Sequence, residues 1–202
     1  MIVAIDGPAG SGKGTIASML AEYFGFKYVD SGLLYRKVAA ASIWAPSVDL
    51  QDAIYSMDFS KDVLRSEEVG ARASEIAGVP QIRSLVTELS RRCAQNIGPY
   101  AGVVMDGRDI GTVVFPGATC KIYLTASPEV RAKRRLAYIN RHGSGTATYE
   151  EVYENILERD SRDSSREIAP LTISDDYVVI DTSNEIPKES FSRIKKIVEN
   201  IL

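Results

Sequence analysis

A glycine-rich segment near the start of the chain constrains the fold more than any other feature. Residues 1–6 read MIVAID, which is typical of a buried β-strand, and residues 16–25 read IASMLAEYFG with the apolar spacing of a helix. Between them lies the loop Gly7-Pro8-Ala9-Gly10-Ser11-Gly12-Lys13-Gly14-Thr15. A strand, a glycine loop with a lysine and a helix together form the arrangement that binds a nucleoside triphosphate.

The chemistry of this loop favours ATP or a similar triphosphate, held together with Mg²⁺. Glycines let the backbone curl so that several N–H groups face phosphate oxygens, and the helix N-terminus adds a partial positive charge. Lys13 adds a full charge that can reach the β- and γ-phosphates. The usual pattern ends Gly-Lys-[Ser/Thr], whereas here Gly14 takes the hydroxyl position and Thr15 follows. We therefore expect the hydroxyl that faces Mg²⁺ either to come from Thr15 or to be replaced by water.

Length and composition restrict the class of protein. A chain of 202 residues can bury a full core, and its net charge of −3 argues against a partner such as nucleic acid. Cys93 and Cys120 lie in apolar surroundings, so we expect buried thiols and no disulfide. No apolar run approaches the length of a membrane span, and the first strand begins at Met1 or Ile2. These features predict a cytoplasmic enzyme, and we expect a monomer with no membrane partner.

Short apolar runs alternate with helical stretches, which predicts an α/β fold with a central five-stranded parallel sheet flanked by helices. The predicted strands are 2–6, 26–30, 102–106, 121–125 and 177–181. The predicted helices are 13–24, 31–43, 82–96, 128–140, 149–162 and 187–202. Residues 44–80 have no clear strand and are mostly helical at best. Ligands of such sheets bind beyond the carboxyl ends of the strands, so the glycine loop, 30–31, 106–109 and 181–182 should share one rim.

Two of these rim segments carry charged side chains that suit phosphate and metal. Ser31 is a candidate N-cap for a helix with Arg36 on an early turn, and Arg36 is either a phosphate ligand or a surface arginine. Asp106 ends an apolar strand beside the loop, where it can help to place Mg²⁺, usually through water. Next to it, Arg108 could clamp a phosphate and Asp109 could accept a hydrogen bond from a base amino group. A structural ion pair in a tight turn is the alternative interpretation for these two residues.

Arginines recur between residues 158 and 166. Arg159, Arg162 and Arg166 are spaced by three and four, so we expect them to share one helical face. Asp160 and Asp163 alternate with them, and a salt-bridge ladder along the helix is one interpretation. The other is a lid whose arginines cover the migrating phosphoryl group and exclude water. The chain shows no candidate nucleophile, which favours direct transfer between two bound substrates.

With these motifs the chain resembles the nucleoside monophosphate kinases and, among them, the bacterial cytidylate kinases, over nearly its whole length. The Gly-Lys-Gly-Thr ending of the loop is common to many monophosphate kinases. Three motifs are more specific: Asp30-Ser31-Gly32 with Tyr35-Arg36; the run from Asp106-Gly107-Arg108-Asp109 to Phe115-Pro116; and Glu158-Arg159-Asp160 through Arg166 with Ala169-Pro170-Leu171. The resemblance implies transfer of the γ-phosphoryl group of ATP to CMP or dCMP, with Mg²⁺.

The resemblance also implies residue roles and an organisation of the chain. Residues 7–15 hold ATP, and Lys13 stabilises charge on the β- and γ-phosphates. The residues implied for the acceptor are Ser74, Arg83 and Asp109 at the cytosine edge, Arg36, Arg108 and Arg159 at the phosphate, and Asp163 and Arg166 at the ribose and neighbouring groups. Ser31 is expected to bind the acceptor as well. Arg159 and Arg162 would also cover the transferred group, and Thr15 and Asp106 would face the metal. The single domain would have a core (1–43, 82–140 and 167–202), an acceptor-binding excursion at about 44–81 and a lid at about 141–166.

Two other functions remain open from the sequence. One is a kinase for a different small acceptor, such as UMP, AMP or shikimate, which the Gly-Arg-Asp run and the lid pattern disfavour. The other is a non-catalytic nucleotide switch. A switch GTPase normally carries an Asn-Lys-x-Asp run, and this chain has none.

Overall fold

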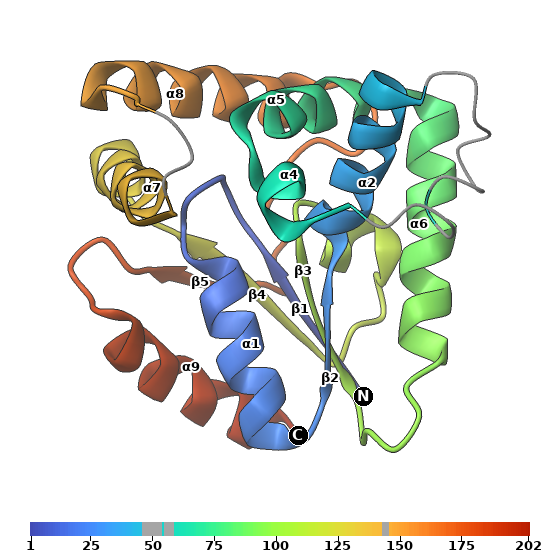
Figure 1. Ribbon diagram of the computed structural model, residues 1–202. Helices are drawn as coiled ribbons and strands as arrows, with labels where there is room; N and C mark the ends of the chain where they lie inside the picture. Colours follow the sequence, from blue (N-terminus) through green and yellow to red (C-terminus); the bar gives the residue numbers. More distant parts are fainter. Residues whose placement is uncertain (46–53, 55–58, 143–145) are drawn as a thin grey trace.

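A parallel sheet forms the centre of the molecule in the computed structural model, which describes residues 1–45, 54, 59–142 and 146–202 (Figure 1). The strands are β1 (Ile2–Asp6), β2 (Lys27–Asp30), β3 (Val103–Gly107), β4 (Cys120–Thr125) and β5 (Val178–Asp181). Their order across the sheet is β2-β3-β1-β4-β5, and every neighbouring pair is parallel. The predicted fold class and all five strands are confirmed, with each strand end within one residue of its predicted position.

Helices cover the sheet and extend beyond its upper edge (Figure 1). They are α1 (Lys13–Phe24), α2 (Ser31–Trp44), α4 (Lys61–Arg65), α5 (Glu67–Ile76), α6 (Pro80–Gln95), α7 (Pro128–His142), α8 (Tyr149–Ser165) and α9 (Pro187–Ile201). All six predicted helices are present. None of the helices in the described part of the chain combines the length and apolar character needed to span a bilayer.

Both faces of the sheet are buried, as a parallel sheet requires. Val3 and Ile5 of β1 point to one face, where α1 and α9 cover them with side chains such as Leu20 and Ile194. Ala4 points to the other face. Because successive side chains alternate along a strand, a continuous apolar run such as residues 2–5 feeds both layers of the core.

Residues 44–80 gave the weakest helical signal in the sequence, and the structure shows why. The described part holds two short helices, α4 and α5, which pack on α2 through Leu64 and Val69 against Val38. Helices of five and ten residues give little room for a periodic pattern. The expected excursion at 44–81 also includes residues 46–53 and 55–58, which lie outside the described residues.

A π-helical turn, η1 (Ile110–Val114), follows β3 and was not expected from the sequence. Its sequence IGTVV has the β-branched character of a strand. The turn forms because the tertiary structure supplies partners for its backbone, as described for Asp6 below.

Helices α7 and α8 pack on each other beside the end of the sheet (Figure 1). Their shared apolar cluster includes Ala132, Ile139, Val152 and Ile156. A capping box starts α8, in which Thr148 and Glu151 each bond the other's backbone N–H. The helix ends at Ser165, three residues beyond its predicted end.

Candidate active site

The P-loop, residues 7–15, joins β1 to α1 through backbone conformations that favour glycine. Gly7, Gly10 and Gly12 have φ angles of 148°, 75° and 93°. A β-carbon on Gly7 would lie 2.0 Å from the carbonyl oxygen of Leu124, so a side chain there would collide with the backbone of β4. The predicted phosphate-binding geometry therefore depends on glycine both for conformation and for close packing.

Lys13 lies buried at the start of α1 and turns back over this loop. Its ammonium donates to the carbonyl oxygen of Pro8 at 2.7 Å and to Oγ of Ser11 at 3.3 Å. The pKa of Lys13 lies well below its ordinary value. Burial is the largest cause, repulsion from Arg108 and Arg159 adds to it, and attraction to Asp106 opposes it. Three cations therefore crowd one end of the loop, where a polyanionic ligand would relieve their repulsion.

Asp106 is the penultimate residue of β3 and lies beside Asp30 of β2, its partner in the strand register. Its Oδ1 accepts a hydrogen bond from the hydroxyl of Tyr28 at 2.9 Å. Burial, followed by the charge of Asp30, raises the pKa of Asp106. Thr15 is exposed on the first turn of α1, and no hydrogen bond joins it to Asp106, although the structure describes both. Of the two predicted metal-facing residues, Asp106 thus lies beside Lys13, and Thr15 is not hydrogen-bonded to Asp106.

Asp6 at the end of β1 was not singled out from the sequence, although it organises the rim. Its two carboxylate oxygens accept the backbone N–H groups of Ile110 and Gly111 at 2.9 and 2.8 Å, and the hydroxyl of Tyr177 donates to it at 2.6 Å. These bonds hold the first turn of η1 directly after Asp109. The sequence did offer a signal for this role, because Asp6 is a carboxylate at the end of an apolar strand, directly before the P-loop.

Asp30 and Ser31 start α2 differently from the prediction. Asp30, not Ser31, is the N-cap, because its Oδ1 accepts from the backbone N–H of Leu33 at 3.0 Å. Ser31 is the first helical residue, and its hydroxyl donates to the carbonyl oxygen of Asp106 at 2.7 Å. The expectation for Ser31 as a cap is therefore wrong by one residue, and the serine instead ties α2 to β3.

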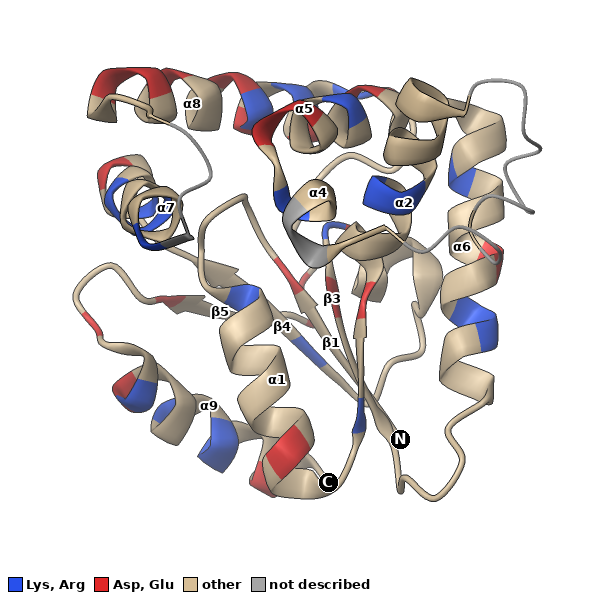
Figure 2. Cartoon of the chain, in the orientation of Figure 1, with Lys and Arg blue, Asp and Glu red and all other residues tan. Residues whose placement is uncertain are grey.

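Arg108 and Asp163 join the β3 rim to α8. Nε of Arg108 donates to Oδ2 of Asp163 at 2.8 Å, and both side chains are largely buried. Burial disfavours the ionised form of Asp163, but Arg108 and Arg159 outweigh it and lower its pKa. Burial, followed by repulsion from Arg108, lowers the pKa of Arg159 to about 9. Figure 2 shows acidic segments at the upper ends of the central strands, and both basic and acidic segments on the helices around them.

The predicted common face of Arg159, Arg162 and Arg166 is found only in part. Arg166 follows the end of α8 with extended backbone, and its Nε donates to the carbonyl oxygen of Ala169 at 2.6 Å. Arg162 is half-buried on α8 and forms no ion pair with another described residue. The carboxylates of α8 pair mainly with arginines of other elements. A self-contained ladder along the helix is therefore wrong as an interpretation.

A buried ion pair between Arg83 of α6 and Asp109 forms the second half of the rim. Arg83 also donates to the carbonyl oxygen of Ala77 at 2.8 Å and lies 5.9 Å from the ring centroid of Tyr35. Ser31, Tyr35 and Asp109 line a narrow crevice between α2, α6 and η1. Ser74 lies buried on α5. The structure thus brings Arg83 and Asp109, far apart in the sequence, into direct contact.

Arg36 approaches the site from α2. It donates to the carbonyl oxygens of Leu64 and Ser66 at 2.6 and 3.2 Å, between α4 and α5. Burial, followed by repulsion from Arg135, lowers the pKa of Arg36 to about 10. Arg135 of α7 pairs with Glu67 of α5, so it adds a cation beside Arg36 that sequence reasoning missed.

Two further arginines of α7 were missed, and both contact the P-loop. Arg131 donates to the carbonyl oxygen of Ala9 at 3.1 Å and to both carboxylate oxygens of Asp160. Arg134 donates to the carbonyl oxygen of Ser11 at 3.3 Å and to that of Thr182 at 2.7 Å. The arginine-rich composition of residues 131–135 was the available signal, but spacing alone does not identify which carbonyl groups these side chains reach.

Several buried side-chain polar atoms have no protein partner. Among the described residues there are four such side-chain atoms: Ser74 Oγ, Thr112 Oγ1, Arg159 Nε and Arg166 Nη2. Three of them, those of Ser74, Arg159 and Arg166, belong to residues that the resemblance implies for the acceptor. Buried polar groups are normally hydrogen-bonded, so these atoms are available to a bound polar group, either a ligand or water.

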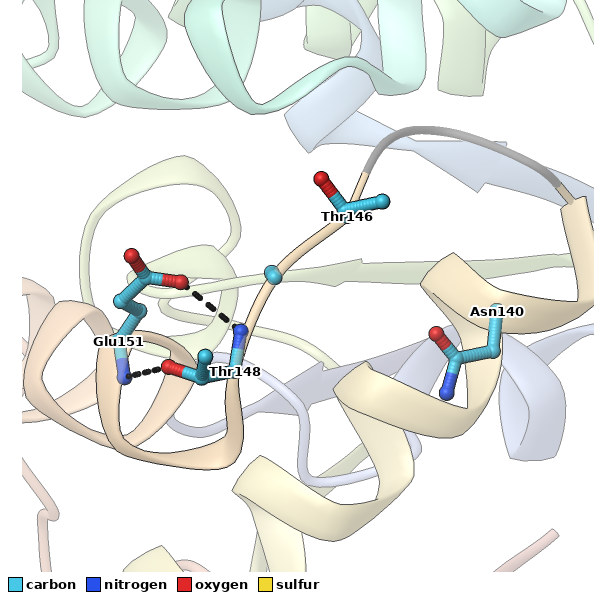
Figure 3. Close-up of a pocket in the computed structure, with 5 residues that line it drawn as sticks. Asn140, Thr146, Thr148 and Glu151 are labelled. Atoms are coloured by element: carbon cyan, nitrogen blue, oxygen red, sulfur yellow. Dashed lines mark hydrogen bonds between the residues drawn. The ribbon is translucent and has the colours of Figure 1, made fainter.

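A separate hollow of about 460 Å³ lies between the end of α7 and the start of α8 (Figure 3). Its lining residues are Asn140, Thr146, Ala147, Thr148 and Glu151. Thr148 and Glu151 are already bonded to each other's backbone N–H groups in the capping box, as the dashed lines in Figure 3 show. None of the predicted site residues lines this hollow.

Comparison with known proteins agrees with the geometry. The family model described as cytidylate kinase matches residues 3–63 and 53–201. The chain belongs to the cytidylate kinase family. A cytidylate kinase from Methylocella silvestris is 43% identical over 209 residues, covering 99% of this chain and 94% of that protein. A cytidylate kinase from Azorhizobium caulinodans is 43% identical, covering 98% of each.

A solved structure, the shikimate kinase from Bacteroides thetaiotaomicron, matches with a TM-score of 0.51 and covers 98% of each chain. At 12% identity it supports the fold alone. The cytidylate kinase family membership therefore rests on the sequence relatives, and the structural neighbour agrees with the kinase-like sheet.

Proposed function

We propose that this chain is an ATP-dependent kinase that transfers the γ-phosphoryl group of ATP to CMP or dCMP in pyrimidine nucleotide metabolism. The observation that carries the proposal is the set of buried, unpartnered atoms of Ser74, Arg159 and Arg166. Arg159 lies on α8, which also carries Asp163 of the Arg108–Asp163 pair, and Arg166 follows the end of that helix. Family membership supports the same activity. ATP and CMP are cytoplasmic metabolites, so we propose that the reaction takes place there.

Catalysis in this proposal depends on position and charge. Lys13 and the backbone N–H groups of the P-loop hold the β- and γ-phosphates, and Arg36, Arg108 and Arg159 orient the phosphate of the acceptor. Arg162, half-buried on the same helix as Arg159, would cover the transferred group together with it. The reaction breaks the bond between the γ-phosphorus and its bridging oxygen as an oxygen of CMP attacks in line.

Mg²⁺ is the metal that the family implies, and the residues present fit it. Asp106 offers a buried carboxylate beside Lys13, and its Oδ2 accepts no hydrogen bond from a described residue. Mg²⁺ prefers oxygen ligands and usually takes one or two carboxylates together with phosphates and water. We propose that Asp106 helps to hold it, through water, at the phosphates of ATP. When bound, the ion neutralises charge that develops between the β- and γ-phosphates.

Recognition of cytosine follows from hydrogen-bond complementarity. In the proposal Asp109 accepts from the exocyclic amine of the base, while Arg83 and Ser74 donate to its carbonyl and ring nitrogen. Uracil lacks this amine, so the carboxylate of Asp109 would lose that donor and face a carbonyl oxygen instead. Asp163 and Arg166 would contact the ribose. The acceptor would lie between the core (1–43, 82–140 and 167–202) and two surrounding parts, the excursion (44–81) and the lid (141–166).

An assay of ADP release with Mg-ATP and a panel of acceptors tests the proposal. The panel contains CMP, dCMP, UMP, AMP, GMP and shikimate. We expect strong turnover with CMP and dCMP and weak turnover with UMP. Strong turnover with another acceptor alone would contradict the cytosine assignment, and ATP binding without turnover on any acceptor would favour a nucleotide switch.

We also propose that the protein acts as a monomer. The large exposed apolar side chains of the described residues lie on different elements, for example Trp44 on α2, Leu157 on α8 and Val179 on β5. Scattered single residues of this kind are normal for a monomer surface. Sedimentation equilibrium at the enzyme's working concentration tests the proposal, and a dimer mass would contradict it.

A further inference from the structure

Gly14 stands where P-loops usually carry a serine or threonine hydroxyl, and other oxygens face this position. A β-carbon built on Gly14 would lie 3.2 Å from the phenolic oxygen of Tyr28 and 3.9 Å from Oδ2 of Asp106. Gly14 has no left-handed backbone conformation that would itself require glycine. The space beside this residue, and not its backbone, therefore accounts for the missing side chain.

Tyr28 reaches this position from β2 and is held there from two sides. Its ring packs against the apolar cluster beneath α1, and its hydroxyl donates to Oδ1 of Asp106 at 2.9 Å. A phenol that donates its proton to a carboxylate keeps its oxygen lone pairs for another partner. The hydroxyl and Oδ2 of Asp106 are thus two fixed oxygens beside the second residue of α1.

We propose that the Tyr28 hydroxyl replaces the missing side-chain hydroxyl of residue 14 and acts as the neutral oxygen that positions the divalent cation beside Asp106. The inference rests on the proposed function, because it takes this cation to be the Mg²⁺ of ATP. A neutral hydroxyl and a carboxylate are both oxygen donors that Mg²⁺ accepts. The proposal also explains why residue 14 is glycine, because a larger side chain would crowd the phenolic oxygen.

The Tyr28→Phe variant tests the proposal because it keeps the ring and removes the oxygen. Titration calorimetry measures the dissociation constant of ADP twice, once in EDTA and once with Mn²⁺. The ratio of the first constant to the second is the gain in ADP affinity that the metal provides. We expect the ratio to fall about tenfold in the variant, while the affinity in EDTA stays at the wild-type value. An unchanged ratio would overturn the proposal.

A second set of variants tests whether a hydroxyl on residue 14 can take the place of the hydroxyl of Tyr28. Gly14→Ser in the Tyr28→Phe background returns an oxygen from the loop itself, and Gly14→Ala in the same background is the matched control without oxygen. We expect serine, and not alanine, to restore most of the metal-dependent gain. Equal recovery by both would mean that packing, and not the hydroxyl, determines metal binding, and would overturn the proposal.

Two further measurements distinguish a loss of structure from a loss of metal binding. Thermal unfolding of each variant identifies a general loss of structure. If Tyr28→Phe fails to fold, Gly14→Ala in the wild-type background should lower the same ratio, because its β-carbon would displace the phenolic oxygen, and an unchanged ratio would overturn the proposal. The calorimetric ratio requires no acceptor, so failure of the wild type to phosphorylate CMP would refute the proposed function alone.

Discussion

Arg131 of α7 binds both carboxylate oxygens of Asp160 on α8, at 3.0 and 2.5 Å, while its Nη1 donates to the carbonyl oxygen of Ala9 at 3.1 Å. Its Nε donates to the carbonyl oxygen of Ala126 at the end of β4. The side chain of Arg131 is 4% exposed. One guanidinium thus connects the P-loop, the sheet and the helix that carries Arg159.

Arg131→Lys should keep the charge and lose the paired geometry, because an ammonium cannot form two parallel bonds to a carboxylate. We expect kcat to fall about 10- to 100-fold, since Arg159 would no longer be fixed relative to the P-loop. Steady-state kinetics with CMP measures this, and Asp160→Asn should give a similar loss. Arg193→Lys is the matched control, because Arg193 lies on α9 in a partly exposed ion pair with Glu185, outside the site. Wild-type kcat in Arg131→Lys would contradict this positioning role.

Lys13→Ala should lower kcat by about 10²- to 10³-fold, because it removes the charge that faces the β- and γ-phosphates. Among the described residues Lys13 donates hydrogen bonds only to Pro8 and Ser11 of its own loop, so we expect the fold to persist. Pre-steady-state phosphoryl transfer measures the chemical step directly, and circular dichroism checks the fold. Lys196→Ala on the exposed side of α9 is the control for loss of a lysine. Near-normal turnover in Lys13→Ala would rule out the proposed role.

Asp109→Asn should alter the choice of base. An amide can donate to the carbonyl of uracil, whereas a carboxylate can only accept, so the ratio of kcat/KM for CMP over UMP should fall at least about tenfold. Asp109→Ala should in addition destabilise the fold by about 3–5 kcal/mol, because Arg83 would remain buried without its partner. Urea unfolding separates the two effects. An equal loss of activity on both acceptors in Asp109→Asn would mean that Asp109 has only a structural role.

Asp6→Asn should weaken both the fold and catalysis. The carboxylate accepts from Ile110, Gly111 and Tyr177, and an amide nitrogen cannot replace one of these acceptors. We expect a loss of about 1–3 kcal/mol in the free energy of unfolding. We also expect a lower kcat because the turn after Asp109 would shift. Unfolding and kinetics measured on the same preparation check this, and unchanged kcat with lower stability would limit Asp6 to the fold.

Asp163 should contribute to acid stability. Burial disfavours its charge, but Arg108 and Arg159 outweigh it and lower its pKa below the ordinary 3.8. The folded state therefore binds this proton less tightly than the unfolded chain, so the stabilisation is present above that value and is lost as the pH falls below it. Wild type should lose more free energy of unfolding than Asp163→Asn between about pH 5 and about pH 3. Parallel pH profiles would contradict the prediction.

The sequence by itself determined the fold class, the strand ends and the P-loop. Apolar runs such as residues 2–5 identify buried parallel strands, and the glycines of residues 7–12 identify a curled loop, because both signals are local. The resemblance of the motifs also identified Arg83, Asp109 and Asp163 as candidate site residues without any knowledge of their contacts. Their roles toward CMP remain proposals.

Only the tertiary structure decided which charges meet. Arg131 and Asp160 are 29 positions apart, and Tyr28 and Asp106 are 78 positions apart, yet each pair is in direct contact. The η1 turn forms against its own β-branched sequence because Asp6, on another strand, accepts its backbone N–H groups. Local patterns carry backbone preference and burial. The partner of a buried charge depends on which strand ends and helices the fold brings together, and this information is not local.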